Sequence, residues 1–481
     1  MSVASPRVAV VGGGISGLSA AHRLTELAPH ARIVLFEAAG RVGGVLGTEQ
    51  RADCMVERSA DMFITRDPWA MELCKRIGFA DRLVNTNPAF RQSFVVCRGK
   101  LEPIPEGFTL MSPARIWPIL ATKILSWPGK MRLASEFFIG RRDSTDDESL
   151  ADFSIRRFGR EAYQRLIQPL IGGIYTADPN KLSMQATMKQ FVDLEQKYGS
   201  LIRGMRAAAK ARPSHEAQAE RAASGARYGL FVAPKDGMSS FIEAVASRLP
   251  DEAIRLNSPV SQVRREADGR WFVTVSEVDG SQSEHPFDAV IVAAPAYRAA
   301  EQLNQVEPEL AKLLGSIPHA GAAVVVSIYR RAEIRHPLDG FGFVVPLVEK
   351  RRILSGSFSS VKFTHRAPED RVVFRSFLGG ACQPELLELT DHQLLDAAHE
   401  ELAELLGISG RPMHNEVVRW HGTMPQYHVG HLQKVDEIER RAAALPGFAI
   451  AGNAYRGVGI PFCVRSGEAA AQRIVDGFSK S

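Results

Sequence analysis

The chain has 481 residues, of which 45% are hydrophobic, 23% charged and 8% aromatic. These values are typical of globular proteins and exclude a disordered, collagen-like or transmembrane-bundle chain, and the length corresponds to about three domains. The net charge of +5, from 59 Lys and Arg against 54 Asp and Glu, comes without a long basic run, which argues against a nucleic-acid partner.

The cysteines and the N-terminus indicate the cellular compartment. The five cysteines are odd in number and form no C-x-x-C pair, which argues against a disulfide framework or a structural zinc site and favours a reducing compartment. The first residues lack the charged region and the cleavage site of a secretory signal. No stretch reaches the ~18 apolar residues that a membrane-spanning helix needs. The sequence therefore predicts a cytoplasmic protein.

The first predicted unit is a strand, a glycine turn, a helix and a second strand. The first strand is expected at Arg7–Val11, the helix at residues 16–27 and the second strand at residues 33–36. A strand-turn-helix-strand order within about 30 residues is typical of a dinucleotide-binding βαβ unit.

The glycines of this turn follow the spacing Gly12-x-Gly14-x-x-Gly17. Such glycines allow a tight turn, a close approach of a pyrophosphate and close packing of the helix on the sheet, while amides at the helix N-terminus stabilise the phosphate charge. Glu37 ends the second strand, where a carboxylate suits ribose hydroxyls and disfavours NADP. The alternative for Glu37 is a solvated acid at a strand end.

Further segments favour FAD over NAD. Arg41, Gly43 and Gly44 follow the second strand at once, and a flavin dinucleotide has a longer body to line. Residues 288–296 form a predicted buried strand that ends in small residues, and residues 451–461 form a glycine-lined turn before the C-terminal helix. Amides of that turn could contact the flavin and its ribitol. The alternatives are an ordinary loop after a strand and a plain C-terminal turn and helix.

Residues 104–213 read as a helical insertion, because strand signals vanish there. Helical periodicity is found over residues 147–158, 161–171 and 183–210. At the front, residues 108–127 carry an apolar face with Lys123 and Lys130 beside it. This pattern suits an interfacial membrane anchor, and a buried helix pair with ordinary surface lysines fits it equally well.

A polar stretch at residues 211–227 is expected to be a mobile linker, and strands recur after it. They are predicted at residues 322–329, 341–346, 353–359 and 372–378, followed by a helix at residues 391–406 and a last strand segment at residues 447–453. Strands of one layer thus come from both ends of the chain, which predicts interleaved domains.

Several segments carry a resemblance to a known family. They include GGGISGLSAA at residues 12–21, the element from Glu37 to Gly44, and GNAYRGVGIP at residues 452–461. With these, the chain resembles the FAD-dependent protoporphyrinogen and coproporphyrinogen III oxidases of the flavin amine-oxidase superfamily, essentially from end to end. Related amine oxidases usually carry an acidic residue where Asn453 stands here.

The resemblance implies a mixed α/β fold of three parts. These are a Rossmann-like FAD-binding domain from residues 1–88, 226–300 and 445–481, a sheet-floored substrate-binding domain from residues 89–107 and 301–444, and a helical membrane-associating domain from residues 108–212.

The activity implied is the oxygen-dependent, six-electron oxidation of a porphyrinogen to a porphyrin in haem biosynthesis. The substrate would be protoporphyrinogen IX or coproporphyrinogen III, with three O2 reduced to H2O2. The alternatives are another flavin amine oxidase or desaturase of the superfamily, and a non-enzymatic escort protein. The resemblance also implies peripheral contact with the cytoplasmic face of a membrane, a homodimer and a hand-off to the next haem-pathway enzyme. It requires no metal and no catalytic side chain, since the flavin supplies the chemistry.

The site residues implied by the resemblance fall into two groups. The cofactor-binding group is Gly12, Gly14, Ile15, Ser16, Gly17, Glu37, Ala38, Arg41, Gly43, Gly44, Val260, Ala293, Ala294, Gly452, Asn453, Val458 and Gly459. The substrate-binding group is Arg91, Gly173, Phe341, Val344 and Phe377. For the position of Arg91 a second alignment gives Ser93, and the alternative for Phe341 and Phe377 is sheet core that faces away from the ligand. The candidate cations for the carboxylates of the substrate are Arg91, Arg98, Lys100, Lys362 and Arg375, whose orientations the sequence leaves open.

The chain departs from the family pattern in two places. Ser59-Ala60 replaces a Gly-Pro pair, and Phe462 replaces an aspartate common in the family. The first change bears on the substrate site and the second on flavin hydrogen bonding or O2 access.

Overall fold

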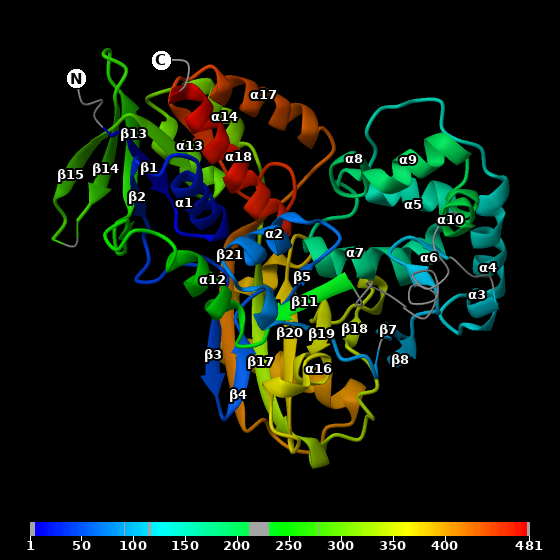
Figure 1. Cartoon of the computed structure of the whole chain (residues 1–481). Coiled ribbons are helices and arrows are strands. Elements are labelled where there is room, and N and C mark those ends of the chain that lie inside the picture. The colour runs from blue at the N-terminus through cyan, green and yellow to red at the C-terminus, as the bar shows by residue number, and fades with distance from the viewer. Residues whose placement is uncertain (1–4, 91, 114–116, 211–229, 278, 479–481) are drawn as a thin grey trace.

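A five-stranded parallel sheet gathers segments from both ends of the chain (Figure 1). Its strands in spatial order are β12 (Ile254–Arg255), β2 (Arg32–Phe36), β1 (Arg7–Val11), β16 (Ala289–Val292) and β22 (Phe448–Ile450). The central strands are buried along almost their whole length, as expected of a parallel sheet covered on both faces. The computed structural model describes residues 5–90, 92–113, 117–210, 230–277 and 279–478, so the predicted linker at residues 211–227 lies outside the described residues.

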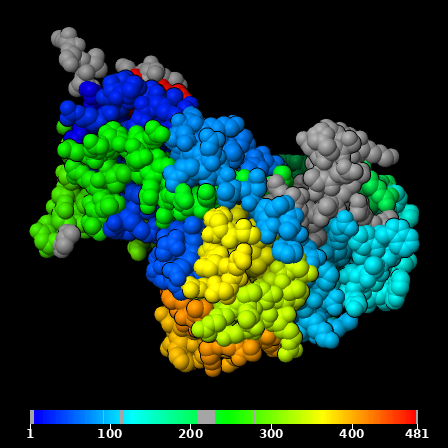
Figure 2. All heavy atoms as spheres, turned by 60° about the horizontal axis from the view of Figure 1, so that its bottom comes forward, coloured from blue at the N-terminus to red at the C-terminus, as the bar shows by residue number. Residues whose placement is uncertain are grey.

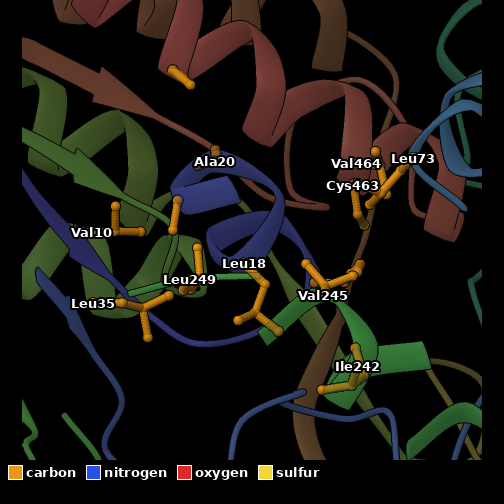
Figure 3. Packing of buried hydrophobic residues seen from close by; sticks show 14 of the residues in the cluster. Val10, Leu18, Ala20, Leu35, Leu73, Ile242, Val245, Leu249, Cys463 and Val464 are labelled. Carbon is orange, nitrogen blue, oxygen red and sulfur yellow. The ribbon is translucent and has the colours of Figure 1, made fainter. Parts of the chain in front are cut away.

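Alternate residues of these strands enter two hydrophobic cores. The first core is shared with α1 (Ile15–Leu27), α2 (Trp69–Arg76), α12 (Met238–Ala246) and α18 (Ile460–Phe478). Figure 3 shows Leu18 of α1 in this core, with Val10 and Leu35 of the sheet on one side and Val245 of α12 on the other. The second core is shared with β13 (Val260–Arg265), β14 (Trp271–Ser276), β15 (Gln282–Phe287), α13 (Ala296–Leu303), α14 (Pro308–Gly315) and α17 (His431–Ala443).

A seven-stranded sheet forms the second layer of the molecule. Its strands in spatial order are β21 (His414–Pro425), β17 (His319–Arg330), β20 (Arg371–Gly379), β19 (Ser355–Phe358), β18 (Gly342–Val344), β7 (Phe94–Cys97) and β8 (Lys100–Pro103). One face packs on α16 (Asp391–Leu406). The other face packs at one end on the hairpin of β3 (Thr48–Arg51) and β4 (Cys54–Glu57).

The helical part has its own core and lies at one end of the molecule (Figure 1). Its helices are α3 (Trp117–Ala121), α4 (Trp127–Ala134), α5 (Leu150–Phe158), α6 (Arg160–Ala162), α7 (Gln168–Tyr175), α8 (Met184–Thr187), α9 (Lys189–Tyr198) and α10 (Leu201–Lys210). Arg157 crosses this core fully buried and pairs with Glu136. The same guanidinium donates to the carbonyl oxygens of Gly140 at 2.9 Å and Gly199 at 3.0 Å, so it ties three loops of the helical part together.

The helical part differs from the sequence prediction in two respects. A short hairpin, β9 (Phe108–Thr109) and β10 (Ser112–Pro113), lies where no strand was expected. The helix expected over residues 183–210 is three helices. Met188 leaves the helical conformation between α8 and α9, and Gly199 ends α9 in a left-handed conformation, which favours glycine.

A small sheet of β5 (Phe63–Ile64), β11 (Phe231–Pro234) and β6 (Leu83–Asn85) lies between the two layers. No helix in the described part of the chain is long and apolar enough to cross a membrane.

Candidate active site

The turn between β1 and α1 is closed by backbone contacts that only glycine allows. Gly12 has φ +107° and donates its N–H to the carbonyl oxygen of Phe36 at 2.8 Å. A Cβ on Gly12 would lie 2.8 Å from the carbonyl oxygen of Ala293, and one on Gly17 would overlap the carbonyl oxygen of Gly12. The turn is therefore as tight as the glycine spacing predicts.

Gly14 differs from these two glycines, because a Cβ there would meet no atom of the described residues within 4 Å. Gly14 is the N-cap of α1, whose N-terminus has no side-chain cap and no acidic residue in its first turn. The amides of Ile15 and Ser16 belong to this first turn. The structure thus leaves a helix N-terminus open to an anionic ligand.

Glu37 is held against the glycine turn. One carboxylate oxygen accepts the N–H of Gly13 at 2.7 Å and the other accepts the N–H of Ala39 at 2.8 Å. The side chain is thus oriented by its own backbone neighbours rather than freely solvated, and each oxygen keeps a lone pair for a ligand hydroxyl. Ala38 is exposed beside it.

The second glycine pair lies next to the first turn. The N–H of Gly43 donates to the carbonyl oxygen of Gly13 at 2.8 Å, and Gly14 and Gly43 form a parallel bridge. Arg41 donates to the carbonyl oxygens of Gly44 and Leu46, both at 2.7 Å. Its guanidinium bonds the backbone of its own loop, so the second glycine pair is held beside the glycine turn that precedes α1.

Two further cofactor segments lie beside the glycine turn and Glu37. Ala293 and Ala294 follow β16 and lie against Gly12. Ser258 donates its N–H to the carbonyl oxygen of Glu37 at 2.8 Å, and Val260 begins β13 two residues later. The predicted adenosine-side residues are therefore neighbours in space.

The C-terminal loop is organised by Tyr427. Its hydroxyl donates to the carbonyl oxygen of Asn453 at 2.5 Å and accepts the N–H of Gly457 at 2.9 Å. Burial raises the pKa of this phenol well above its ordinary value. Val458 and Gly459 then lead into α18, whose first turn carries no acidic residue. This loop thus leads into a second helix N-terminus without an acidic side chain.

His431 supports the same loop from behind. Its imidazole stacks on Tyr427 with ring centroids 4.0 Å apart, and its Nε2 lies 2.9 Å from the carbonyl oxygen of Tyr455. Burial lowers the pKa of His431 to about 4. A neutral, backbone-bonded imidazole of this kind is a structural residue rather than a general base at neutral pH.

A pH-dependent stability follows from His431. Because the folded state favours the neutral ring, its contribution is full above the unfolded pKa of 6.5 and is lost as pH falls toward 4. The shift corresponds to about 3 kcal/mol of unfolding free energy. In urea unfolding between pH 7 and pH 4, His431→Gln is expected to remove this part of the pH dependence. His392→Gln, a change to a side chain that is 86% exposed, serves as the control; equal pH slopes for both variants would contradict the assignment.

The substrate-side candidates lie in the seven-stranded sheet. Val344 pairs with Ser355, Ser355 with Phe377, and Phe377 with Val324, so these side chains form one row on one face of the sheet. Gly173 lies over this row, since its Cβ would be 3.6 Å from Val344. The structure thus brings Gly173, Val344 and Phe377 together.

The other two substrate-side candidates are placed differently. Phe341 is buried at the start of β18, where its N–H donates to Gln92 and its carbonyl oxygen accepts from Phe358, both at 3.0 Å. It lies outside the row. Arg91 lies outside the described residues. The roles of all site residues in binding stay predictions.

Sequence reasoning missed Trp420 and Ser357 near the row, and it named Arg375 only as one of several cations of open orientation. Trp420 is half-buried on β21 and donates its indole N–H to the carbonyl oxygen of Arg58 at 2.9 Å. Ser357 and Arg375 pair across β19 and β20, two residues from Ser355 and Phe377. Alternation along each strand was visible in the sequence, whereas the strand pairing that joins them was not.

A buried charged cluster lies beside this face. It consists of Glu57, Asp61, Lys362, Arg366 and Arg375. Asp61 accepts from Lys362 at 3.1 Å and lies 3.2 Å from Arg375 and 3.4 Å from Arg366. The three cations outweigh the burial of Asp61 and hold the pKa of its carboxyl well below its ordinary range. The cluster links the loop after β4 to the substrate sheet.

The residues present fit FAD. The uncapped N-terminus of α1 and the open space at Gly14 suit a pyrophosphate, and the fixed carboxylate of Glu37 suits a ribose. The glycine-lined loop before α18, a helix whose first turn has no acidic residue, suits the flavin end of a dinucleotide.

Comparisons with known proteins agree with this geometry. The family model described as flavin-containing amine oxidoreductase matches residues 15–475. The coproporphyrinogen III oxidase of Bacillus subtilis (strain 168) is 33% identical over 98% of both chains. The protoporphyrinogen oxidase 2 of Arabidopsis thaliana is 27% identical over 98% of this chain and 94% of its own.

Solved structures of other proteins share the fold of this chain. A protein from Exiguobacterium sp. 255-15, provisionally named a protoporphyrinogen oxidase, superposes with a TM-score of 0.85 at 30% identity, covering 98% of this chain and 99% of its own. Cyclohexylamine oxidase from Brevibacterium oxydans IH-35A, at 16% identity and a TM-score of 0.69, shares the fold.

Fold, site and comparisons together define an FAD-dependent oxidase, and the predicted mixed α/β fold class and FAD cofactor are confirmed. The chain belongs to the flavin-containing amine oxidoreductase family.

Proposed function

We propose that this chain oxidises a porphyrinogen, coproporphyrinogen III or protoporphyrinogen IX, to the corresponding porphyrin in haem biosynthesis. The reaction removes six electrons and reduces three O2 to H2O2. The similarity to porphyrinogen oxidases over the whole chain supports this proposal.

The observation that carries the proposal is the face of the seven-stranded sheet around Val344, Phe377 and Trp420. These half-buried apolar side chains lie on three strands of one sheet, and an extended apolar wall suits a large, flat, hydrophobic substrate. Three residues beyond Trp420, the carbonyl oxygen of Thr423 accepts from the Asn453 side chain at 3.3 Å. The substrate face therefore adjoins the loop expected to hold the flavin.

The chain's own residues would bind and orient the substrate. FAD, when bound, supplies the redox chemistry by accepting electron pairs from the substrate. The apolar row fixes the macrocycle by contact and excludes water, and Gly173 leaves room above Val344 for it. The buried cations beside the row attract the carboxylates at the rim of the substrate.

The test of this function is a comparison of kcat/KM among substrates. FAD-loaded protein is given coproporphyrinogen III, protoporphyrinogen IX and a polyamine, and porphyrin fluorescence and peroxide release are followed. Turnover of a porphyrinogen with peroxide formation supports the proposal. Faster turnover of the amine would instead assign the chain to amine oxidation, the alternative within the family.

We also propose that the helical part contacts an anionic membrane surface. Four large apolar side chains are strongly exposed on it: Trp117 (81%), Trp127 (67%), Met131 (66%) and Phe138 (81%). They belong to α3, α4 and the 3-10 turn that follows α4. Exposure of such large apolar side chains to water is unfavourable, and their contact with a lipid interface is favourable.

Cations accompany these side chains. Lys123 is exposed between α3 and α4, and the exposed Arg203 and Arg206 of α10 lie 4.6 Å and 5.7 Å from the ring of Phe137. Figure 2 shows the residues of this region, in cyan, at one end of the molecule. The five free cysteines support a cytoplasmic location for this contact.

The membrane proposal predicts the behaviour of one double variant. Trp117→Ser with Phe138→Ser is expected to lower binding to vesicles rich in anionic lipid by roughly tenfold or more, because each buried side chain contributes about 1.5–3 kcal/mol. Co-sedimentation measures the change, with Met413→Ser, a change to an exposed side chain elsewhere, as the control. Equal binding of the double variant and the control would contradict the proposal.

A further inference from the structure

Arg375 holds an unusual position on the substrate face. It lies on β20 only 2% exposed, donates to the carbonyl oxygen of Ser59, and its guanidinium carbon is 5.3 Å from the ring centre of Phe377. Its Nη1 pairs with Asp61 at 3.2 Å. Its Nε, in contrast, has no hydrogen-bond partner among the residues that the structure describes.

Ser357 lies directly across from Arg375 on β19. The two residues are in register, and paired residues of adjacent strands project their side chains on the same face. The buried Oγ of Ser357 likewise finds no partner within the described ranges. Two buried donors without acceptors therefore stand next to each other. The Nε atoms of Arg58, Arg157, Arg366 and Arg371 also lack partners within the described ranges, so the feature that distinguishes Arg375 is the position of Ser357 directly across the ladder.

The charges around this pair are unbalanced. The buried cluster contains three cations, Lys362, Arg366 and Arg375, against two carboxylates, Glu57 and Asp61, which leaves one positive charge in excess. A buried excess charge is costly unless an anion compensates it. Ser59, Ser355 and Phe377, which lie close to Arg375 and Ser357, are half-buried. Arg375 and Ser357 therefore lie at the border of the substrate face.

We propose that Arg375 and Ser357 bind a carboxylate of the substrate. This inference rests on the proposed porphyrinogen oxidase function and deepens it. A carboxylate would accept from the Nε–H of Arg375 and the hydroxyl of Ser357, and it would neutralise the excess charge. Since Phe377 is two residues from Arg375 on the same face, the macrocycle of that substrate would lie on the apolar row while its acid group reaches the pair.

The experiment measures binding of coproporphyrin III and of its tetramethyl ester to FAD-loaded protein by fluorescence quenching. The wild-type chain is expected to bind the acid more tightly than the ester. Ser357→Ala and Arg375→Gln are each expected to weaken binding of the acid roughly tenfold, as for a hydrogen bond to a charged group, and to leave binding of the ester unchanged.

Matched controls lie on the same strand. Ser376→Ala removes another buried hydroxyl without a partner in the described part of the chain, on the opposite face of β20. Arg371→Gln removes an arginine that pairs with the exposed Asp53 at 2.9 Å. Neither substitution is expected to change the ratio of the binding affinities for the acid and for the ester. Ser357→Ala removes no hydrogen bond made within the described residues, so its melting temperature should match that of the wild type even if Arg375→Gln folds poorly.

The outcomes separate the two proposals. If the wild type binds neither porphyrin, the proposed function fails. If it binds both and Ser357→Ala keeps the full acid-to-ester ratio, only the assignment of the carboxylate site is overturned. The carboxylate site is supported if Ser357→Ala and Arg375→Gln both lose the preference for the acid over the ester while Ser376→Ala and Arg371→Gln keep it.

Discussion

Gly14→Val is expected to give a folded protein that binds FAD at least roughly a hundredfold more weakly. A Cβ at this position meets no atom within 4 Å in the part of the chain that the structure describes, and Gly14 has an ordinary extended conformation, φ −67° and ψ 173°. The valine would instead occupy the space in front of the helix N-terminus, where the pyrophosphate must approach the backbone. The purified variant should be colourless, with the melting temperature of the FAD-free wild type.

Two other glycines give the controls for this prediction. Gly140→Val changes a glycine with equally open surroundings in the helical part and should leave FAD binding intact. Gly17→Ala places a Cβ onto the carbonyl oxygen of Gly12 and should destabilise the fold itself. If purified Gly14→Val were yellow and carried as much FAD as the wild type, the pyrophosphate would have to bind at another place.

The second large effect is expected from Arg366→Met. Arg366 is 1% exposed, donates to the carbonyl oxygen of Asp61 at 2.9 Å, and lies 3.4 Å from the carboxylates of both Asp61 and Glu57. Removing one partner of a buried ion pair costs about 3–5 kcal/mol, here because Glu57 has no other ion pair among the described residues and would stay buried without one. Urea unfolding at neutral pH measures the loss, and Arg330→Met, in an exposed pair with Glu333, should cost little.

The pH dependence of this variant follows from Asp61. The pKa of its carboxyl is lowered in the folded state by Lys362, Arg375 and Arg366. Its stabilising contribution is therefore present above the unfolded pKa of 3.8 and is lost as pH falls below that value. Since Arg366→Met removes one of the three cations, the acid-induced loss of stability should become smaller below pH 4. If the wild type and Arg366→Met lost the same unfolding free energy below pH 4, Asp61 would not be coupled to Arg366.

The cofactor half of the site could be predicted from the sequence because its determinants are local. Gly12, Gly14, Gly17 and Glu37 lie within one βαβ unit, where spacing alone sets the turn and the position of the acid. The full-length resemblance supplied the three-part fold. The role of Arg41 differed in detail, since its guanidinium bonds the carbonyl oxygens of its own loop.

The substrate half depended on strand pairing that no local pattern records. Ser357 and Arg375 are 18 residues apart in the chain and become neighbours only through the register of β19 and β20. Trp420 joins the same face from β21, across β17. The excess charge is likewise visible only once Asp61 and Lys362 are brought to 3.1 Å from segments about 300 residues apart.

The order of strands in the parallel sheet has a consequence for biosynthesis. β1 and β2 leave the ribosome first, yet β1 pairs with β16, and β16 pairs with β22 near the end of the chain. The loop before α18 is synthesised later still. A nascent chain therefore cannot complete its cofactor site until β22 and the loop before α18 have been translated, and uptake of FAD marks a molecule in which the two distant halves of the sheet have met.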